Sequence, residues 1–329
     1  MVTSRQFARG MVRTMRAMDR AAKQAERQRI ARQNALHREA MLGASAQAVA
    51  EYDEMVEALT GAHRVNLRKR DWLTTATAPD EAPPQRKDTH QQIARANLDA
   101  YSPGLLDMVF RRQARTMAAL ADKVEAARAQ DEEAHARAVE AAAGRNAQAA
   151  AARRVQERDP DAMVAALEEH SDLGRLPFSV EGIDTMFLDG RIIAVVDGLD
   201  LEDMPEESVT LLKSGKASFK ALAAGKRLEL HRSAICSAAL RVAIEFLGTL
   251  PLDEVEVLML TDLLDAATGH LDGAPVLHVR VTEQALKAVN LGRTDAYALV
   301  ERLGGHMSWS RREGFREINA AAFGIDLSS

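Results

Sequence analysis

Apolar residues recur at helical spacing along the first sixty positions of the chain. Between residues 7 and 18, and again between 49 and 59, they lie three or four positions apart. Residues 3–60 contain no proline, and Ala, Arg, Gln, Glu and Met, which favour helix, dominate them. This pattern predicts a helix from residue 3 to about residue 60 that ends at Gly61.

The next hundred residues repeat this helical character after one interruption. Residues 74–88 hold three of the nine prolines and no large apolar residue, which predicts a linker. Helical spacing returns over 89–99 and, after a Ser-Pro-Gly break, from 104 to about 157. Beyond residue 125 the apolar stripe is almost all alanine. We expect the long helices to pair as an antiparallel coiled coil, within one chain or between copies.

The pattern changes from helical to β-rich after Asp159-Pro160. Runs at 178–188 and 191–196 flank Asp189-Gly190, a strong hairpin signal. The remaining pattern predicts a strand at 208–213, a helix at 226–247, strands at 255–261 and 275–281, and helices at 282–289 and 293–303. The strand at 255–261 is apolar on both faces and is therefore expected at the centre of a sheet.

The predicted fold class is therefore α+β: a long helical coiled-coil N-terminal half followed by a mixed α+β C-terminal domain. Its predicted parts are a basic long helix (1–73), a proline-rich linker (74–88), a helical arm (89–158) and the α+β domain (160–329).

Composition excludes several classes of protein. No run approaches the length of apolar sequence that crosses a membrane, so no membrane span is expected. The single cysteine, Cys236, excludes a disulfide framework and a Cys-based zinc site, and its apolar surroundings predict a buried thiol. The N-terminus lacks the apolar core of a secretory signal, so a cytoplasmic location is expected. No cofactor is predicted.

Charge is distributed unevenly along the chain. The net charge is −5, but residues 1–40 carry ten Lys and Arg against three Asp and Glu, a net +7, which leaves −12 for the rest. Seven of these cations recur three or four positions apart, which places them on one helix face. This basic row is Arg5, Arg9, Arg13, Arg16, Arg20, Lys23 and Arg27.

The basic row fits several partners. It matches a nucleic-acid backbone, for which binding weakens steeply with salt. It also matches an acidic protein surface and, less well, an anionic membrane. The alternative is the solvated outer face of a coiled coil.

Two further segments carry candidate binding residues. Lys213, Lys216 and Lys220 lie in a stretch that looks like a phosphate-binding loop, but Thr210 and Ala217 stand where that motif requires Gly and Ser or Thr. We interpret the stretch as an exposed turn, with a phosphate or nucleic-acid contact as the alternative.

Trp309 precedes Arg311 and Arg312, a combination that can stack on and hold a single nucleic-acid strand. A packing role for the tryptophan is the favoured interpretation. His278 and Arg280 share one face of their predicted strand, where they line a pocket or meet solvent. No spacing of His, Asp or Glu matches a metal-binding motif, so no metal site is predicted.

An enzymatic alternative comes from the order of elements. Helix, three strands, helix and strand over 162–261 is also the order in the core of many restriction-type nucleases. Such a site requires an acid and then Glu-x-Lys on the next strand to hold magnesium. Asp197 and Lys213 occupy two of these positions, but Leu211 stands where the second acid belongs. A divergent metal-dependent nuclease is therefore the second interpretation.

Three stretches resemble a family of uncharacterised bacterial proteins: YSPGLLD (101–107), LLKSGKASFKAL (211–222) and residues 230–281. The last, from the helix with AICSAALRVA to the strand VLHVRV, is similar to the segment preceding the catalytic domain of some Mrr-type restriction endonucleases of actinobacteria. We expect no such catalytic domain within residues 1–329. The resemblance implies a cytoplasmic bacterial protein that contributes to defence against foreign DNA, and it transfers no active-site residue.

The sequence as a whole predicts a non-enzymatic binding or scaffold protein. Its basic row is expected to contact nucleic acid or a partner protein, and its helices are expected to form a homo-oligomer. A purely structural coiled-coil assembly protein is the third interpretation.

Overall fold

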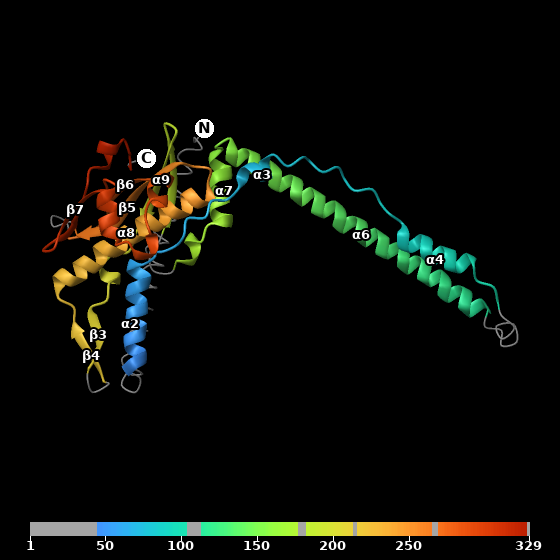
Figure 1. Cartoon of the computed structure of the whole chain (residues 1–329), viewed down its shortest axis with the longest axis horizontal. Helices are drawn as coiled ribbons and strands as arrows, with labels where there is room; N and C mark the ends of the chain where they lie inside the picture. Colours follow the sequence, from blue (N-terminus) through green and yellow to red (C-terminus); the bar gives the residue numbers. More distant parts are fainter. Residues whose placement is uncertain (1–44, 104–112, 177–181, 213–215, 265–268, 328–329) are drawn as a thin grey trace. The chain divides into compact units, whose positions relative to one another are not determined.

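The structure is a computed structural model that describes residues 45–103, 113–176, 182–212, 216–264 and 269–327 (Figure 1). The chain has an α+β fold and divides into two compact units. The described residues up to Lys69 and from Ala166 onward form the α+β unit, and the described residues of Arg70–Ala165 form a second unit, the arm.

A six-stranded sheet forms the centre of the α+β unit, with strand order β1-β2-β5-β6-β7-β8. The strands are β1 (Gly182–Leu188), β2 (Arg191–Asp197), β5 (Glu254–Leu264), β6 (Leu271–Thr282), β7 (His306–Ser310) and β8 (Gly314–Arg316). Strands β2 and β5 are parallel, and the other pairs are antiparallel. Asp189 and Gly190 both have positive φ angles, as a two-residue hairpin turn requires, so the predicted hairpin is confirmed.

Helix α8 (Ala224–Thr249) precedes β5 along the chain and lies against the sheet (Figure 1). The sheet buries apolar side chains on both of its faces. One face packs on α8, which is buried along most of its length. On the other face, Ile193 and Leu258 form a core with Ile318 and Ile325 of the C-terminal segment. Strand β5 is therefore central and covered on both sides, as predicted from its apolar run.

Helix α2 (Ser45–Thr60) belongs to the α+β unit. It ends before Gly61, as predicted, and packs on α8 through a core that contains Leu59, Leu199 and Ala234. The sequence predicts that the N-terminal helix pairs with the helix at 104–157. Its described part packs on α8 and the segment after β2 instead, because Leu230, Leu199 and Met204 supply large apolar side chains there, whereas the buried stripe of α6 is mostly alanine.

Strand β3 (Glu207–Leu211) does not join the main sheet. Among the residues that the structure describes it pairs only with β4 (Ala217–Ala221), and this two-stranded ribbon lies beside α2. The sequence predicted a strand at 208–213 and left its pairing partner open.

Short elements complete the α+β unit: α9 (Glu283–Lys287), α10 (Ala296–Arg302) and 3₁₀ turns at Leu173–Arg175, Leu201–Asp203, Leu291–Arg293 and Ala320–Phe323. Helix α7 (Pro160–His170) contains the boundary between the units.

The arm is built on a single helix, α6 (Gln113–Gln156), whose 44 residues extend for about 66 Å. The short α3 (Trp72–Ala76), the extended segment 77–88 and α4 (Thr89–Asp99) run along it (Figure 1). The buried stripe of α6 is mostly alanine, which lets the covering chain approach closely. The structure does not show the predicted long coiled coil, because α6 is covered by this short helix and extended segment.

Candidate binding surfaces

Part of the predicted binding surface cannot be placed. The whole basic row, Arg5 to Arg27, and Lys213 lie outside the described residues. What the structure does place is the start of α2, where Ala48 is fully buried. The chain that follows the basic row is thus anchored to the α+β unit. Within the described ranges, no helix combines the length and apolar character needed to cross a bilayer.

The lysine-rich stretch forms the β3–β4 ribbon. Lys216 is exposed, and Lys220 lies opposite Ser208 on the neighbouring strand. The next pair in the register is Val209 and Phe219, of which Phe219 is 38% exposed. A phosphate-binding loop requires a strand followed directly by a helix. The stretch instead connects two strands, so it presents lysines beside an apolar side chain.

The arrangement of the strands does not support the nuclease alternative. Asp197 ends β2, where its register partners are Gly182 on β1 and Leu260 on β5. Because β3 lies in a separate ribbon, the strand that ends near Lys213 is not the neighbour of the strand carrying Asp197. Across the described parts of the chain, no group of three or more His, Cys, Asp or Glu residues is placed to hold a metal ion.

The carboxyl ends of the parallel strands β2 and β5 are a place where many α/β proteins bind ligands. Here the protein's own groups fill it. Asp200 Oδ1 accepts hydrogen bonds from Thr261 Oγ1 (3.0 Å) and the Asp262 amide (2.7 Å). The ring of His231 is buried with its Nε2 2.8 Å from the carbonyl oxygen of Leu199. Burial lowers the pKa of His231.

The single cysteine is part of the core. Cys236 on α8 is fully buried, and burial raises the pKa of its thiol to about 12. A thiol that stays protonated and inaccessible is a poor nucleophile. The predicted structural role of Cys236 is confirmed.

A buried carboxylate lies among cations on the sheet face covered by the C-terminal segment. Glu256 on β5 has a side chain only 3% exposed, and Nε2 of His278 lies 3.0 Å from its Oε2. Its Oε1 accepts a 2.8 Å bond from Arg280 Nη2, and Arg191 Nη1 lies 3.3 Å from both oxygens. The His278 ring also stacks on Phe323 at 4.1 Å.

These contacts define the Glu256 cluster: Glu256, Arg191, His278 and Arg280. Burial raises the pKa of the Glu256 carboxyl, but the hydrogen bonds from His278 and Arg280 and the charge of Arg191 outweigh burial and leave it below the ordinary value. Both carboxylate oxygens are engaged, so the cluster holds three strands and the C-terminal segment together. The sequence correctly placed His278 and Arg280 on one face. It did not identify Glu256, although an acidic residue flanked by apolar residues within a strand could have pointed to it.

Trp309 packs within the protein, as favoured from the sequence. Its ring stacks on the guanidinium of Arg232, whose Cζ lies 4.1 Å from the ring centroid. That face of the indole is therefore closed to a nucleic-acid base. Arg311 is exposed and pairs with Glu229 at 3.0 Å, while Arg312 is exposed in the same turn.

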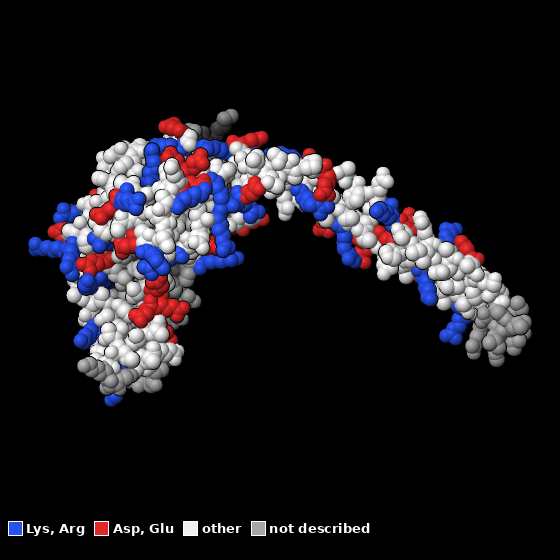
Figure 2. Space-filling model, viewed as in Figure 1, with Lys and Arg blue, Asp and Glu red and all other residues white. Residues whose placement is uncertain are grey.

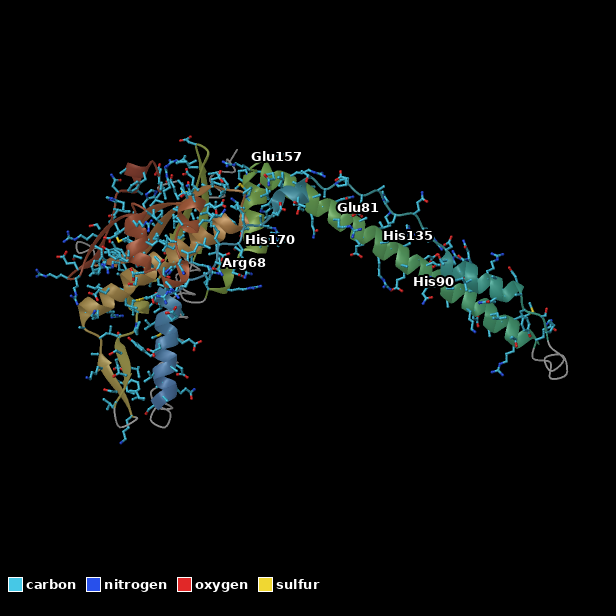
Figure 3. All side chains as sticks on the ribbon, viewed as in Figure 1. Arg68, Glu81, His90, His135, Glu157 and His170 are labelled. Carbon is cyan, nitrogen blue, oxygen red and sulfur yellow. The ribbon has the colours of Figure 1, made fainter. Side chains whose placement is uncertain are left out.

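The arm is held together by polar contacts. Arg145 makes a two-bond ion pair with Glu81 at 2.6 and 2.7 Å, and Arg153 bonds Asp80 at 2.7 Å. Glu81 and His90 lie on the segment that runs beside α6 (Figure 3). Outside these contacts, cations and acids are interspersed along the visible face of the arm (Figure 2).

Asp131 is the point where α6 caps α4. Its buried carboxylate accepts bonds from the amides of His90 (3.2 Å) and Gln91 (2.8 Å), a role that the residue before α4, Asp88, does not fill. We expect Asp131→Ala to speed hydrogen exchange of the first-turn amides of α4 roughly fivefold, because their acceptor is lost. Asp122→Ala, on an exposed part of α6, is the control. Equal exchange in both variants would contradict this capping role.

Comparisons of the chain with protein-family models, with curated proteins and with solved structures give no significant match.

Proposed function

We propose that this protein is a non-enzymatic binding protein whose basic row binds the phosphate backbone of nucleic acid. The observation that carries the proposal is the seven-cation row at helical spacing, in a segment of net charge +7 joined to a remainder of −12. A row of this kind matches regularly spaced phosphates, whereas the acidic remainder repels them.

The described structure is compatible with this division of roles. Helix α2 continues the chain directly after the basic segment and is fixed on α8 by Met55 and Leu59. A nucleic acid bound by the row would thus be tethered to a folded unit. The connection with defence against foreign DNA is proposed on the sequence resemblance alone.

We further propose that the arm associates with a second copy of the chain as a coiled coil. Large apolar side chains remain exposed on it: Met117 and Val139 of α6 are 46% and 37% exposed, and Ile93 of α4 is 59% exposed. Their burial in a partner would make the arm a scaffold between copies.

Two double variants with the same loss of charge test the role of the basic row. Arg9→Gln/Arg13→Gln removes two members of the row, and Arg29→Gln/Arg32→Gln removes two arginines that project to the opposite side of the same helical wheel. In fluorescence anisotropy with duplex DNA and single-stranded RNA at low salt, we expect the first to weaken binding about tenfold. The second is expected to change it less than about threefold, since its cations face away.

Equal effects of the two double variants would mean that overall charge, rather than the row, determines binding. The absence of binding by the unaltered chain at low salt would refute the proposal and leave an acidic protein partner as the leading alternative.

A further inference from the structure

An arginine is held between two aromatic rings on the surface of the α+β unit. The guanidinium carbon of Arg232, on α8, lies 3.7 Å from the ring centroid of Tyr297 on α10 and 4.1 Å from that of Trp309 on β7. Both faces of the planar guanidinium are therefore covered. We call Arg232, Tyr297 and Trp309 the arginine clamp.

The clamp contains hydrogen-bond donors without acceptors. The Nε atom of Arg232 and the Nε1 atom of Trp309 are buried and have no hydrogen-bond partner. Among the described residues, the guanidinium of Arg232 makes no hydrogen bond or ion pair at all. Arg232 is half-buried, and its Nη atoms, unlike Nε, reach the surface and form the accessible edge of the clamp. Buried donors of this kind are rare in folded proteins.

The surroundings hold the clamp rigidly. Tyr297 donates its hydroxyl hydrogen to Glu301 one turn further along α10. The turn after Trp309 lies against α8, where a side chain at Gly225 would come within 3.3 Å of Arg311 and one at Gly314 within 2.7 Å of Leu228. A guanidinium fixed in this way loses little conformational entropy when it binds, unlike a free surface arginine.

The local charge favours one small anion over a continuous polyanion. Glu229 lies one helical turn from Arg232 and is paired with Lys226 (2.8 Å) and Arg311 (3.0 Å). Glu301 lies on the other side, bonded to Tyr297. These two carboxylates repel a strand of successive phosphates, whereas the edge of one guanidinium matches the two oxygens of a single carboxylate.

From this geometry we propose that the arginine clamp is a recognition site in which the Nη edge of Arg232 binds a carboxylate presented by a partner protein. The site is separate from the basic row, and the proposal does not depend on nucleic-acid binding.

The test uses the full chain, deuterated and ¹⁵N-labelled, with a short end-capped peptide that carries one glutamate among glycines as the probe at constant ionic strength. The chain has two indole N–H groups, on Trp309 in the clamp and on Trp72 in the arm, so the second is an internal reference. We expect a saturable shift of the Trp309 signal with no shift of the Trp72 signal. Replacing all seven cations of the basic row by Gln is expected to leave the Trp309 shift in place, which separates this proposal from the previous one.

Three variants make the test specific. Arg232→Gln is expected to abolish the shift, and Arg232→Lys to weaken the apparent affinity at least about tenfold, because an ammonium group lacks the planar fork. Arg312→Gln removes the same charge from an exposed position in the neighbouring turn and is expected to change the affinity less than about threefold. If Arg232→Gln does not fold, the comparison of Arg232→Lys with Arg312→Gln still tests the proposal.

Several outcomes would overturn the proposal: no saturable Trp309 shift, equal effects of Arg232→Lys and Arg312→Gln, or a shift that disappears with the basic row. Saturation by inorganic phosphate or a single-stranded oligonucleotide but not by the one-glutamate peptide would also overturn it, since the ligand would then be a phosphate.

Discussion

Glu256→Gln is expected to destabilise the α+β unit by about 3 kcal/mol in urea unfolding, because it leaves Arg191, Arg280 and His278 around a neutral amide. The expected cost is at the lower end of the range for broken buried ion pairs, since the side chain of Arg280 is 53% exposed and can turn to water. Glu254→Gln is the matched control. It changes an exposed glutamate two residues earlier on the same strand and should cost less than about 0.5 kcal/mol.

The stability advantage of the natural chain over Glu256→Gln is expected to depend on pH in the acid range. The pKa of Glu256 in the folded protein lies below the ordinary value of about 4.3. Its ionised form therefore stabilises the fold fully above that value, and the stabilisation is lost as the pH falls through the folded-state pKa. The stability curves of the natural chain and Glu256→Gln should converge in strong acid. Curves that stay parallel would contradict the ion-pair explanation.

Lowering the pH from 7.5 to 5.5 is expected to destabilise the α+β unit through two buried histidines. Burial lowers the pKa of His63, whose ring nitrogens contact Ser237 Oγ and the Thr294 carbonyl oxygen, each at 2.9 Å. Burial also lowers the pKa of His231. Both rings are thus neutral in the folded chain at pH values where the unfolded chain already binds protons.

The direction in which stability changes with pH follows from these pKa shifts. Stability is fully present above the unfolded pKa of about 6.5 and falls as the pH decreases below it, by up to about 1.4 kcal/mol per pH unit for each histidine. Urea unfolding at a series of pH values should show stability falling below pH 6.5 with a slope of at most about 2.7 kcal/mol per pH unit, and His63→Gln and His231→Gln should each reduce that slope. His306→Gln, which replaces an exposed histidine rather than a buried one, is the matched control. A slope insensitive to both buried-site variants would refute the assignment.

Helices and strands were predicted correctly where the residues that specify them lie close together in the sequence. The hairpin at Asp189-Gly190 and the helix at 89–99 require only turn chemistry and helical spacing, and both are present. The same holds for the central strand β5, whose unbroken apolar run needs cover on both faces.

Pairings between distant segments were not predictable from the sequence. Strand β3 has the same local pattern whether it joins β2 or forms a ribbon with β4, and α2 carries an apolar stripe that fits either α6 or α8. The Glu256 cluster depends on register between strands, and the arginine clamp joins residues 232, 297 and 309 from three elements. No periodicity in the sequence encodes these contacts.

The central claim, that the basic row binds a nucleic-acid backbone, is tested most directly by the salt dependence of binding. Affinity of the full chain for duplex DNA should be measured from 50 to 200 mM salt. Engagement of all seven cations predicts a slope of log affinity against log salt of about −6, and the chain with the seven cations replaced by Gln should show a slope near zero. A shallow slope for the natural chain, or the same slope in both, would contradict the claim.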